Sequence, residues 1–112
     1  MELISTCKRS QAKGRRAEIE LAGLLQERGY NVRPGEPLNF GREADIVGLA
    51  GIHCEVKRRE GVDLSAALAQ AARDAELFGD GLPTVFHRGN RQRWRVTMEL
   101  DHWLALYHRQ KT

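Results

Sequence analysis

Two carboxylates in one apolar stretch of the sequence have the spacing of a metal site. The stretch from Ala44 to Lys57 is rich in β-branched residues and predicts two strands joined by a glycine-flanked turn. If the turn is centred on Ala50, Asp45 lies opposite Glu55, with Cβ atoms roughly 5 Å apart. Two carboxylates this close repel each other unless a cation lies between them, and Mg²⁺ prefers oxygen ligands. The pair therefore predicts a site for Mg²⁺ or Mn²⁺.

Lys57 adds a positive charge to this predicted site. Side chains alternate along a strand, so Glu55 and Lys57 share one face, while Cys54 and Val56 face the opposite side and can enter a core. An ammonium group at this position could orient a water nucleophile or stabilise the negative charge of a phosphodiester transition state. We therefore expect metal-dependent hydrolysis of phosphodiester bonds. An exposed hairpin with an ordinary Glu–Lys pair is the alternative reading.

A helix that brings a further carboxylate toward the core is predicted from about Ser10 to Arg28. Its apolar stripe holds Leu21, Ala22 and Leu25, and Glu18 falls on the same stripe. An acidic side chain that faces a core needs a partner. A metal or its bound water is one choice. The alternative is an inward-reaching arginine, or a glutamate that lies only at the edge of the stripe.

The remaining patterns predict an α/β fold with a central mixed sheet of about four strands flanked by helices. The expected elements are a strand at Tyr30–Arg33, a helix capped by Asp63 and ending at Phe78, strands at Pro83–His87 and Arg93–Val96, and a final helix capped by Thr97. The final helix has an apolar stripe of Leu100, Trp103, Leu104 and Tyr107. This stripe is expected to be either core or interface.

Length and composition predict one domain, residues 1–112. Apolar residues make up 41% of the chain and charged residues 29%, and no apolar run approaches the ~20 residues of a membrane span. The N-terminus lacks the pattern of a signal peptide, so we expect a cytoplasmic protein without a membrane partner. Cys7 and Cys54 are far apart, which argues against a zinc site or a disulfide framework.

Arginine supplies most of the positive charge. The net charge is only +3, yet the chain has 14 Arg and 4 Lys, and they are clustered. Guanidinium groups suit bidentate contacts to phosphate, which favours a DNA partner over a merely solvated surface. The expected phosphate-contacting residues are Lys13, Arg15, Arg16, Arg42, Arg58 and Arg59.

Two motifs resemble a known family of nucleases. The segment Lys13-Gly14-Arg15-Arg16-Ala17-Glu18 resembles the K-G-x-x-x-E opening helix of the archaeal-type Holliday junction resolvases. Asp45, Glu55 and Lys57 resemble the D-(x)n-E-x-K core of the PD-(D/E)xK superfamily to which those resolvases belong, with Ala44 at the place of the nominal proline. The resemblance implies a restriction endonuclease-like fold and a Mg²⁺-dependent endonuclease that cleaves branched DNA in recombination. The loop at 39–43 has no serine, unlike the corresponding segment of the resolvases.

The resemblance also assigns roles to individual residues. It implies a catalytic set of Glu18, Asp45, Glu55 and Lys57, with the metal held by the three carboxylates and a backbone carbonyl at Val56. Several branches of the superfamily use a glutamine on the helix after the E-x-K strand, and Gln70 is the residue expected there. Two other functions stay open. One is a phage- or mobile-element-type nuclease that cleaves linear or single-stranded DNA, and the other is a catalytically silent DNA-binding module.

Substrate geometry predicts the assembly. Resolution of a four-way junction needs two nicks, whereas this chain has residues for one active site. A two-fold homodimer presents two matched sites, and the resolvases it resembles are dimeric. We therefore expect a homodimer, for which the surface around Trp103, Leu104 and Tyr107 is the expected contact.

Overall fold

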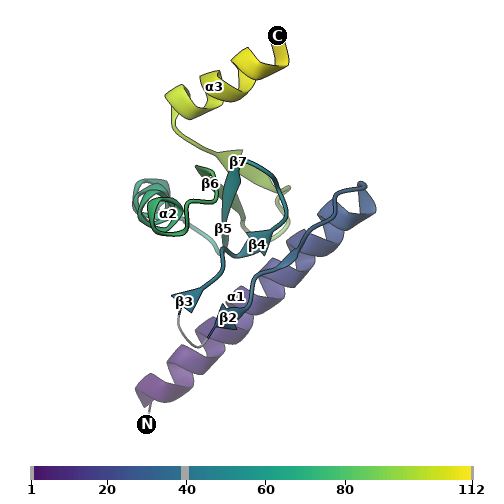
Figure 1. The fold of residues 1–112 in the computed structure, drawn as a ribbon. Coiled ribbons are helices and arrows are strands. Elements are labelled where there is room, and N and C mark those ends of the chain that lie inside the picture. Colours follow the sequence, from purple (N-terminus) through teal and green to yellow (C-terminus); the bar gives the residue numbers. More distant parts are fainter. Residues whose placement is uncertain (1, 39–40, 112) are drawn as a thin grey trace.

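A computed structural model describes the backbone of residues 2–38 and 41–111 and the side chains of residues 14–36 and 43–111. The helices are α1 (Glu2–Glu27), α2 (Leu64–Phe78) and α3 (Leu100–Lys111). The strands are β1 (Arg33–Pro34), β2 (Pro37–Leu38), β3 (Gly41–Arg42), β4 (Ile46–Val47), β5 (Ile52–Arg58), β6 (Leu82–Arg88) and β7 (Arg95–Thr97). Figure 1 shows α1 and α2 beside a small central sheet, with α3 projecting from it.

The central sheet has five strands in the order β1-β4-β5-β6-β7. β5 and β6 are parallel, with α2 as the crossover between them, and the other neighbouring strands are antiparallel. The prediction of a mixed α/β sheet flanked by helices is therefore confirmed, with one strand more than expected. β2 and β3 form a separate two-stranded ribbon.

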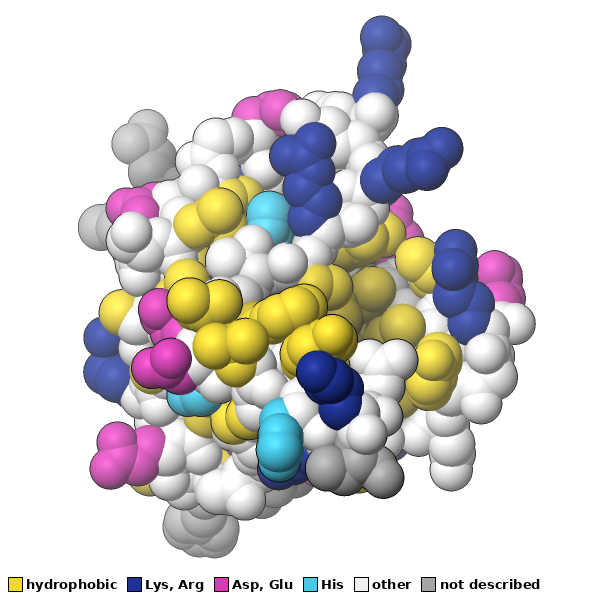
Figure 2. All heavy atoms as spheres, turned by 90° about the horizontal axis from the view of Figure 1, so that it is seen from above, with side chains coloured by type: hydrophobic (Ala, Val, Ile, Leu, Met, Phe, Trp, Pro, Cys, Tyr) yellow, Lys and Arg dark blue, Asp and Glu magenta, His cyan; other side chains and the backbone are white. Residues whose placement is uncertain are grey.

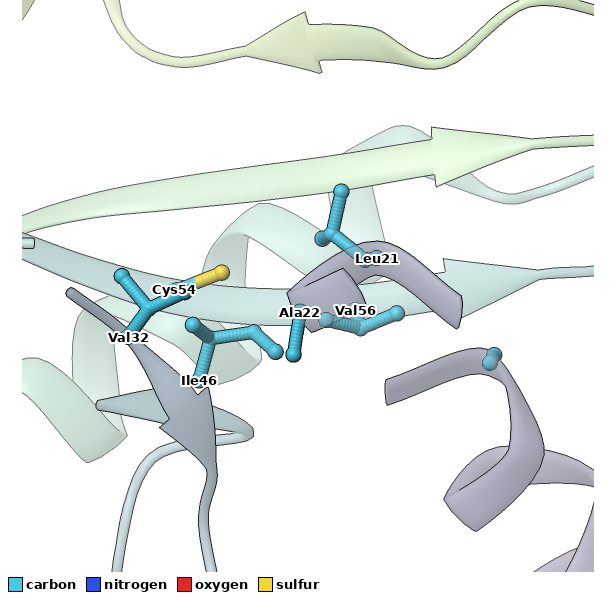
Figure 3. Packing of buried hydrophobic residues seen from close by; sticks show 7 residues of the cluster. Leu21, Ala22, Val32, Ile46, Cys54 and Val56 are labelled. Carbon is cyan, nitrogen blue, oxygen red and sulfur yellow. The ribbon is translucent and has the colours of Figure 1, made fainter. Parts of the chain in front are cut away.

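Helix α1 covers the face of β5 that carries Cys54 and Val56. Leu21 and Ala22 pack there against both residues and against Ile46 of β4. Figure 3 shows these apolar side chains meeting between the helix and the sheet. Cys54 is fully buried and its thiol is free, as expected of a small core residue.

Helix α2 covers the opposite face of the sheet. Its buried residues are alanines, and Ala67 and Ala71 pack against Val85 of β6. The predicted ends are confirmed. Asp63 caps the N-terminus by accepting a hydrogen bond from the backbone amide of Ala66 at 3.1 Å, and Gly79 ends the helix with the left-handed φ of 61° that glycine adopts without strain. The small alanine side chains let the helix approach the strands closely.

Two predicted boundaries in the first third of the chain are wrong. Helix α1 begins at Glu2 rather than Ser10, and no Gly or Pro interrupts residues 2–13. The first strand begins at Arg33 rather than Tyr30. Tyr30 stays in the turn that closes α1, because its backbone amide donates to the carbonyl of Leu25 at 3.1 Å.

The predicted cap of the last helix is also wrong. Thr97 is the final residue of β7, paired with Val85, and its hydroxyl lies 2.8 Å from His87 Nε2. These contacts keep the chain extended through Thr97. Helix α3 therefore starts at Leu100, where the backbone amide of Trp103 donates to the carbonyl of Glu99 at 3.0 Å. The strand before it spans Arg95–Thr97 instead of Arg93–Val96.

Helix α3 leaves its apolar stripe in solvent. None of its residues is buried, and Trp103 stacks on Tyr107 with ring centroids 5.3 Å apart. Figure 2, seen from the side of α3, shows apolar side chains gathered across this face. The stripe is therefore not core within one chain. Among the described residues, no helix is long and apolar enough to cross a membrane.

Candidate functional site

The hairpin of β4 and β5 sets Asp45 beside Glu55. Ile46 pairs with Cys54, and continuing this antiparallel register by one residue places Asp45 opposite Glu55, as the turn centred on Ala50 predicted. The backbone amide of Asp45 donates to the carbonyl of Cys54 at 3.1 Å. The two carboxylates thus lie at the end of β4, at the point where the two strands separate.

Glu18 reaches this pair from α1. Its carboxyl group shares a hydrogen bond with Asp45, and only 19% of its side chain is exposed. Arg15 lies one helical turn earlier, with its guanidinium 3.4 Å from the Glu18 carboxylate. The predicted inward position of Glu18 is therefore confirmed. Of its expected partners an arginine is present, and the carboxyl group of Asp45 is a partner that was not expected.

Two of the three acidic groups, Asp45 and Glu18, have raised pKa values. Burial raises the pKa of Asp45 to about 7, and the nearby charges of Glu55 and Glu18 add to this rise. The pKa of Glu18 is also raised by burial, although its hydrogen bond with Asp45 and the charge of Arg15 oppose the rise. Asp45 is thus the group that holds a proton and donates it to Glu18. The proton on Asp45 thus reduces the negative charge of the site, as a bound cation would also do.

Lys57 and Gln70 complete one side of the site. Lys57 Nζ lies 3.7 Å from Glu55 Oε1 and donates to Gln70 Oε1 at 3.3 Å. Gln70 belongs to α2, so the pairing joins strand β5 to the helix that covers it. The lysine side chain is 27% exposed and that of Glu55 is 7% exposed. Lys57 is therefore a partly exposed cation beside a buried carboxylate, in contact with the glutamine that the family resemblance implies.

Gly35 connects Arg15 to the segment that carries Asp45. Its carbonyl accepts a short hydrogen bond from the Arg15 guanidinium, and its amide donates to the carbonyl of Asp45 at 2.8 Å. A Cβ atom at position 35 would collide with the backbone carbonyl of Ala44. Glycine is thus required by this close approach. The sequence showed a turn at Pro34-Gly35 but gave no sign of the contact.

His53 belongs to the immediate surroundings of the site. It lies on the Glu55 face of β5 and is fully buried. Nδ1 is 2.9 Å from Asp80 Oδ1, in the link between α2 and β6, while Nε2 is 3.8 Å from Glu55 Oε2. Burial lowers the pKa of His53, but Glu55 and Asp80 outweigh it, so the net shift is upward. Because His53 is fully buried, it does not offer a surface for contact with a substrate.

The carboxyl groups of Glu18, Asp45 and Glu55 do not form one tight cluster. Within the part of the chain whose side chains are described, one group of His, Cys, Asp or Glu has three ligand atoms within 4.8 Å of one another, and it consists of His53, Glu55 and Asp74. Glu18, Asp45 and Glu55 do not meet this limit together. Glu55 is the residue common to both arrangements.

The predicted phosphate-contacting residues have different surroundings. Arg16 and Arg59 are exposed. Arg58 lies 3.7 Å from Glu20, a residue that Arg88 also binds at 2.7 Å. Glu20 therefore neutralises part of the positive charge of Arg58 and Arg88, and no DNA partner is needed to explain these two arginines. A hollow on the surface of α1 is lined by Arg16, Ala17, Glu20 and Arg58. The side chains of Lys13 and Arg42 lie outside the described residues.

The site thus combines the carboxyl groups of Glu18, Asp45 and Glu55 with the ammonium group of Lys57, where α1 lies beside β5 and the start of β4. Carboxylate oxygens are the kind of ligand that a divalent cation prefers, and a lysine can neutralise charge on a bound anion. Comparison with known proteins found no matching family model, no matching curated protein and no matching solved structure.

Proposed function

We propose that this protein is a metal-dependent endonuclease that hydrolyses phosphodiester bonds of DNA. The observation that carries the proposal is the arrangement of Asp45 between Glu18 and Glu55, with Lys57 3.7 Å from Glu55. Burying or half-burying three acidic groups beside a lysine destabilises the folded state. A chain without a ligand at this site would have no need for such an arrangement. The resemblance of the same residues to the PD-(D/E)xK motif points to the same chemistry.

The donor set fits a hard divalent cation. Asp45 holds a proton because burial and Glu55 disfavour a second negative charge, and a cation would remove that penalty. Asp45 and Glu55, with Glu18 and the Val56 carbonyl as the motif suggests, offer the oxygen ligands that Mg²⁺ and Mn²⁺ prefer. When bound, such an ion lowers the pKa of water and polarises the phosphoryl group.

The protein's own groups have distinct tasks in this proposal. Lys57 faces the position of the scissile phosphate and offsets its developing charge, while its hydrogen bond to Gln70 holds the ammonium in place. While no cation is bound, Glu18 accepts a hydrogen bond from Asp45, which links α1 to the acidic pair. Arg15 holds Glu18 at 3.4 Å and limits its rotation.

The DNA backbone would lie along the basic side of α1. Exposed Arg16 and Arg59 are free to contact phosphate, whereas Arg58 must share its charge with Glu20. We favour branched DNA as the substrate because the opening helix and the acidic motif both resemble those of the junction resolvases. In this proposal two chains pair through α3, whose exposed apolar residues are otherwise uncovered. This pairing would provide the two active sites that junction resolution needs.

Cleavage assays with defined DNA structures test the proposal. A four-way junction, a flap, a linear duplex and a single strand of the same sequence would be incubated with the protein in Mg²⁺, in Mn²⁺ and in EDTA. The expected result is metal-dependent nicking that is fastest on the junction and absent for Asp45→Asn. Equal cleavage of linear DNA would favour the phage- or mobile-element-type nuclease. DNA binding with no cleavage in either metal would instead identify a silent binding module.

A further inference from the structure

His53 is a fully buried histidine with one nitrogen unpaired. Its Nδ1 lies 2.9 and 3.0 Å from the two carboxylate oxygens of Asp80, so this nitrogen has its hydrogen-bond partner. Nε2 has no hydrogen-bond partner and no exposed surface. Buried polar atoms are nearly always satisfied, and an unpaired one needs a physical reason. The reason lies in what faces Nε2.

Acidic side chains lie near Nε2, the nitrogen of this imidazole that has no hydrogen-bond partner. Glu55 Oε2 is 3.8 Å from Nε2, which is too long for a hydrogen bond. Asp74 of α2 completes a group in which one ligand atom from each residue lies within 4.8 Å of the others. Lys57 approaches the other oxygen of Glu55. Glu55 and Asp74 thus bring carboxylate oxygens close to this imidazole, and oxygens and a ring nitrogen in such proximity can bind one metal ion together.

Asp80 gives the imidazole the orientation of a metal ligand. A carboxylate that accepts from one ring nitrogen fixes the tautomer and turns the lone pair of the other nitrogen toward the ion. Imidazole with carboxylates suits Zn²⁺ and related borderline ions better than Mg²⁺, which prefers oxygen ligands alone. The 3.8 Å between Nε2 and Glu55 Oε2 fits two ligands that each lie roughly 2.0–2.2 Å from one ion.

We infer that His53 Nε2, Glu55 and Asp74 bind one transition-metal ion of the Zn²⁺ type between β5 and α2, with Asp80 as the orienting partner. This site is separate from the oxygen-ligand site at Asp45, and Glu55 is the residue that the two share. It does not depend on the proposed nuclease activity, because metal binding can be measured without DNA. The competing explanation is a doubly protonated His53 that forms ion pairs with Asp80 and Glu55.

Co²⁺ serves as the probe, because an imidazole ligand alters its visible absorption and Zn²⁺ displaces it. The full chain would be titrated with Co²⁺ alone at pH 7 and then with Zn²⁺. His53→Gln and Asp74→Asn remove a proposed ligand, and Asp80→Asn removes the orienting carboxylate. Asp101→Asn, which changes an exposed carboxylate at the start of α3, is the control. Circular dichroism would establish that each variant is folded.

The expected result is one Co²⁺ per chain with imidazole ligation, displaced by Zn²⁺. Asp74→Asn should reduce the affinity at least tenfold, and Asp80→Asn should reduce it about 10–100-fold. Asp101→Asn should keep the absorption. If His53→Gln does not fold, the nitrogen resonances of His53 provide the same test, because Zn²⁺ should leave a single N–H at Nδ1. The inference would be overturned by unchanged affinity in Asp74→Asn, or by a His53 that keeps both protons in excess Zn²⁺.

Discussion

The backbone amide of Val56 donates a hydrogen bond to Asp45 Oδ2 at 2.8 Å. This bond crosses from the end of β4 to the middle of β5 and fixes one oxygen of a carboxyl group whose other oxygen can face a ligand or Glu18. The acidic pair is therefore held by the sheet itself rather than by mobile side chains. Because an asparagine can keep the same acceptor oxygen, changes at Asp45 can test chemistry without removing this anchor.

Asp45→Asn and Glu55→Gln should each abolish cleavage while DNA binding is kept or becomes tighter. Both substitutions remove a proposed metal ligand, and both also remove a negative charge that repels phosphate. Cleavage of a labelled junction and its binding in Ca²⁺ would be measured side by side. Glu27→Gln, an exposed change on α1, is the matched control and should behave as wild type. Near wild-type cleavage by either site variant would refute the assignment.

Stability without metal should fall as pH rises from about 4 to about 7. The folded state raises the pKa of Asp45 to about 7, so it binds a proton that the unfolded chain has already released in this range. Mg²⁺ should therefore raise the melting temperature clearly at pH 8 and little at pH 5. Differential scanning calorimetry of wild type and Asp45→Asn provides the comparison. The variant should be the more stable protein at pH 8 in EDTA and should lose the Mg²⁺ response.

Lys57→Ala should reduce turnover by about 100-fold or more, with little change in substrate affinity, because its charge is needed when the transition state forms. Lys111→Ala is the control, since Lys111 is exposed and lies near Tyr107 on α3. Single-turnover rates at saturating enzyme would separate chemistry from binding. A Lys57→Ala protein that binds DNA weakly but cleaves it at the normal rate would place this lysine in binding instead.

Gly35→Ala should destabilise the fold by about 1–3 kcal/mol and disturb the site, because its Cβ would push the Ala44 carbonyl and the neighbouring Asp45. Gly14→Ala is the matched control. It lies in helix α1, its Cβ would meet open space, and alanine favours a helix by roughly 1 kcal/mol over glycine. Urea unfolding would measure both effects. Equal stability of the two variants would show that the close approach at Gly35 can relax without cost.

Trp103→Ser combined with Leu104→Ser should convert a dimer into a monomer, since both side chains belong to the uncovered stripe of α3. Light scattering at micromolar concentration, with and without a junction, would follow the change. Leu77→Ser is the control because Leu77 is 77% exposed and lies on α2. A wild-type protein that is monomeric in both conditions and cleaves linear DNA as readily as a junction would exclude the resolvase-like assembly.

Local rules were sufficient wherever the decisive contacts are close in sequence. The register that sets Asp45 opposite Glu55 follows from alternation along two strands and a short turn. The ends of α2 follow from Asp63 and Gly79, whose capping geometry involves their immediate neighbours. The inward position of Glu18 follows from helical periodicity alone. These features were determined by the sequence because a shift of one residue would expose the apolar face to water.

Tertiary structure decided the contacts between distant segments. Asp80 reaches His53 only because β5 and β6 are parallel and α2 returns the chain to the end of the sheet where both strands begin. The fit of Gly35 against Ala44 and the hydrogen bond from Arg15 likewise depend on how α1 lies over the hairpin. Periodicity tells which face of an element is buried, but it does not tell which residues of another element meet that face. That choice depends on the packing of the whole chain, which minimises its exposed apolar surface as one unit.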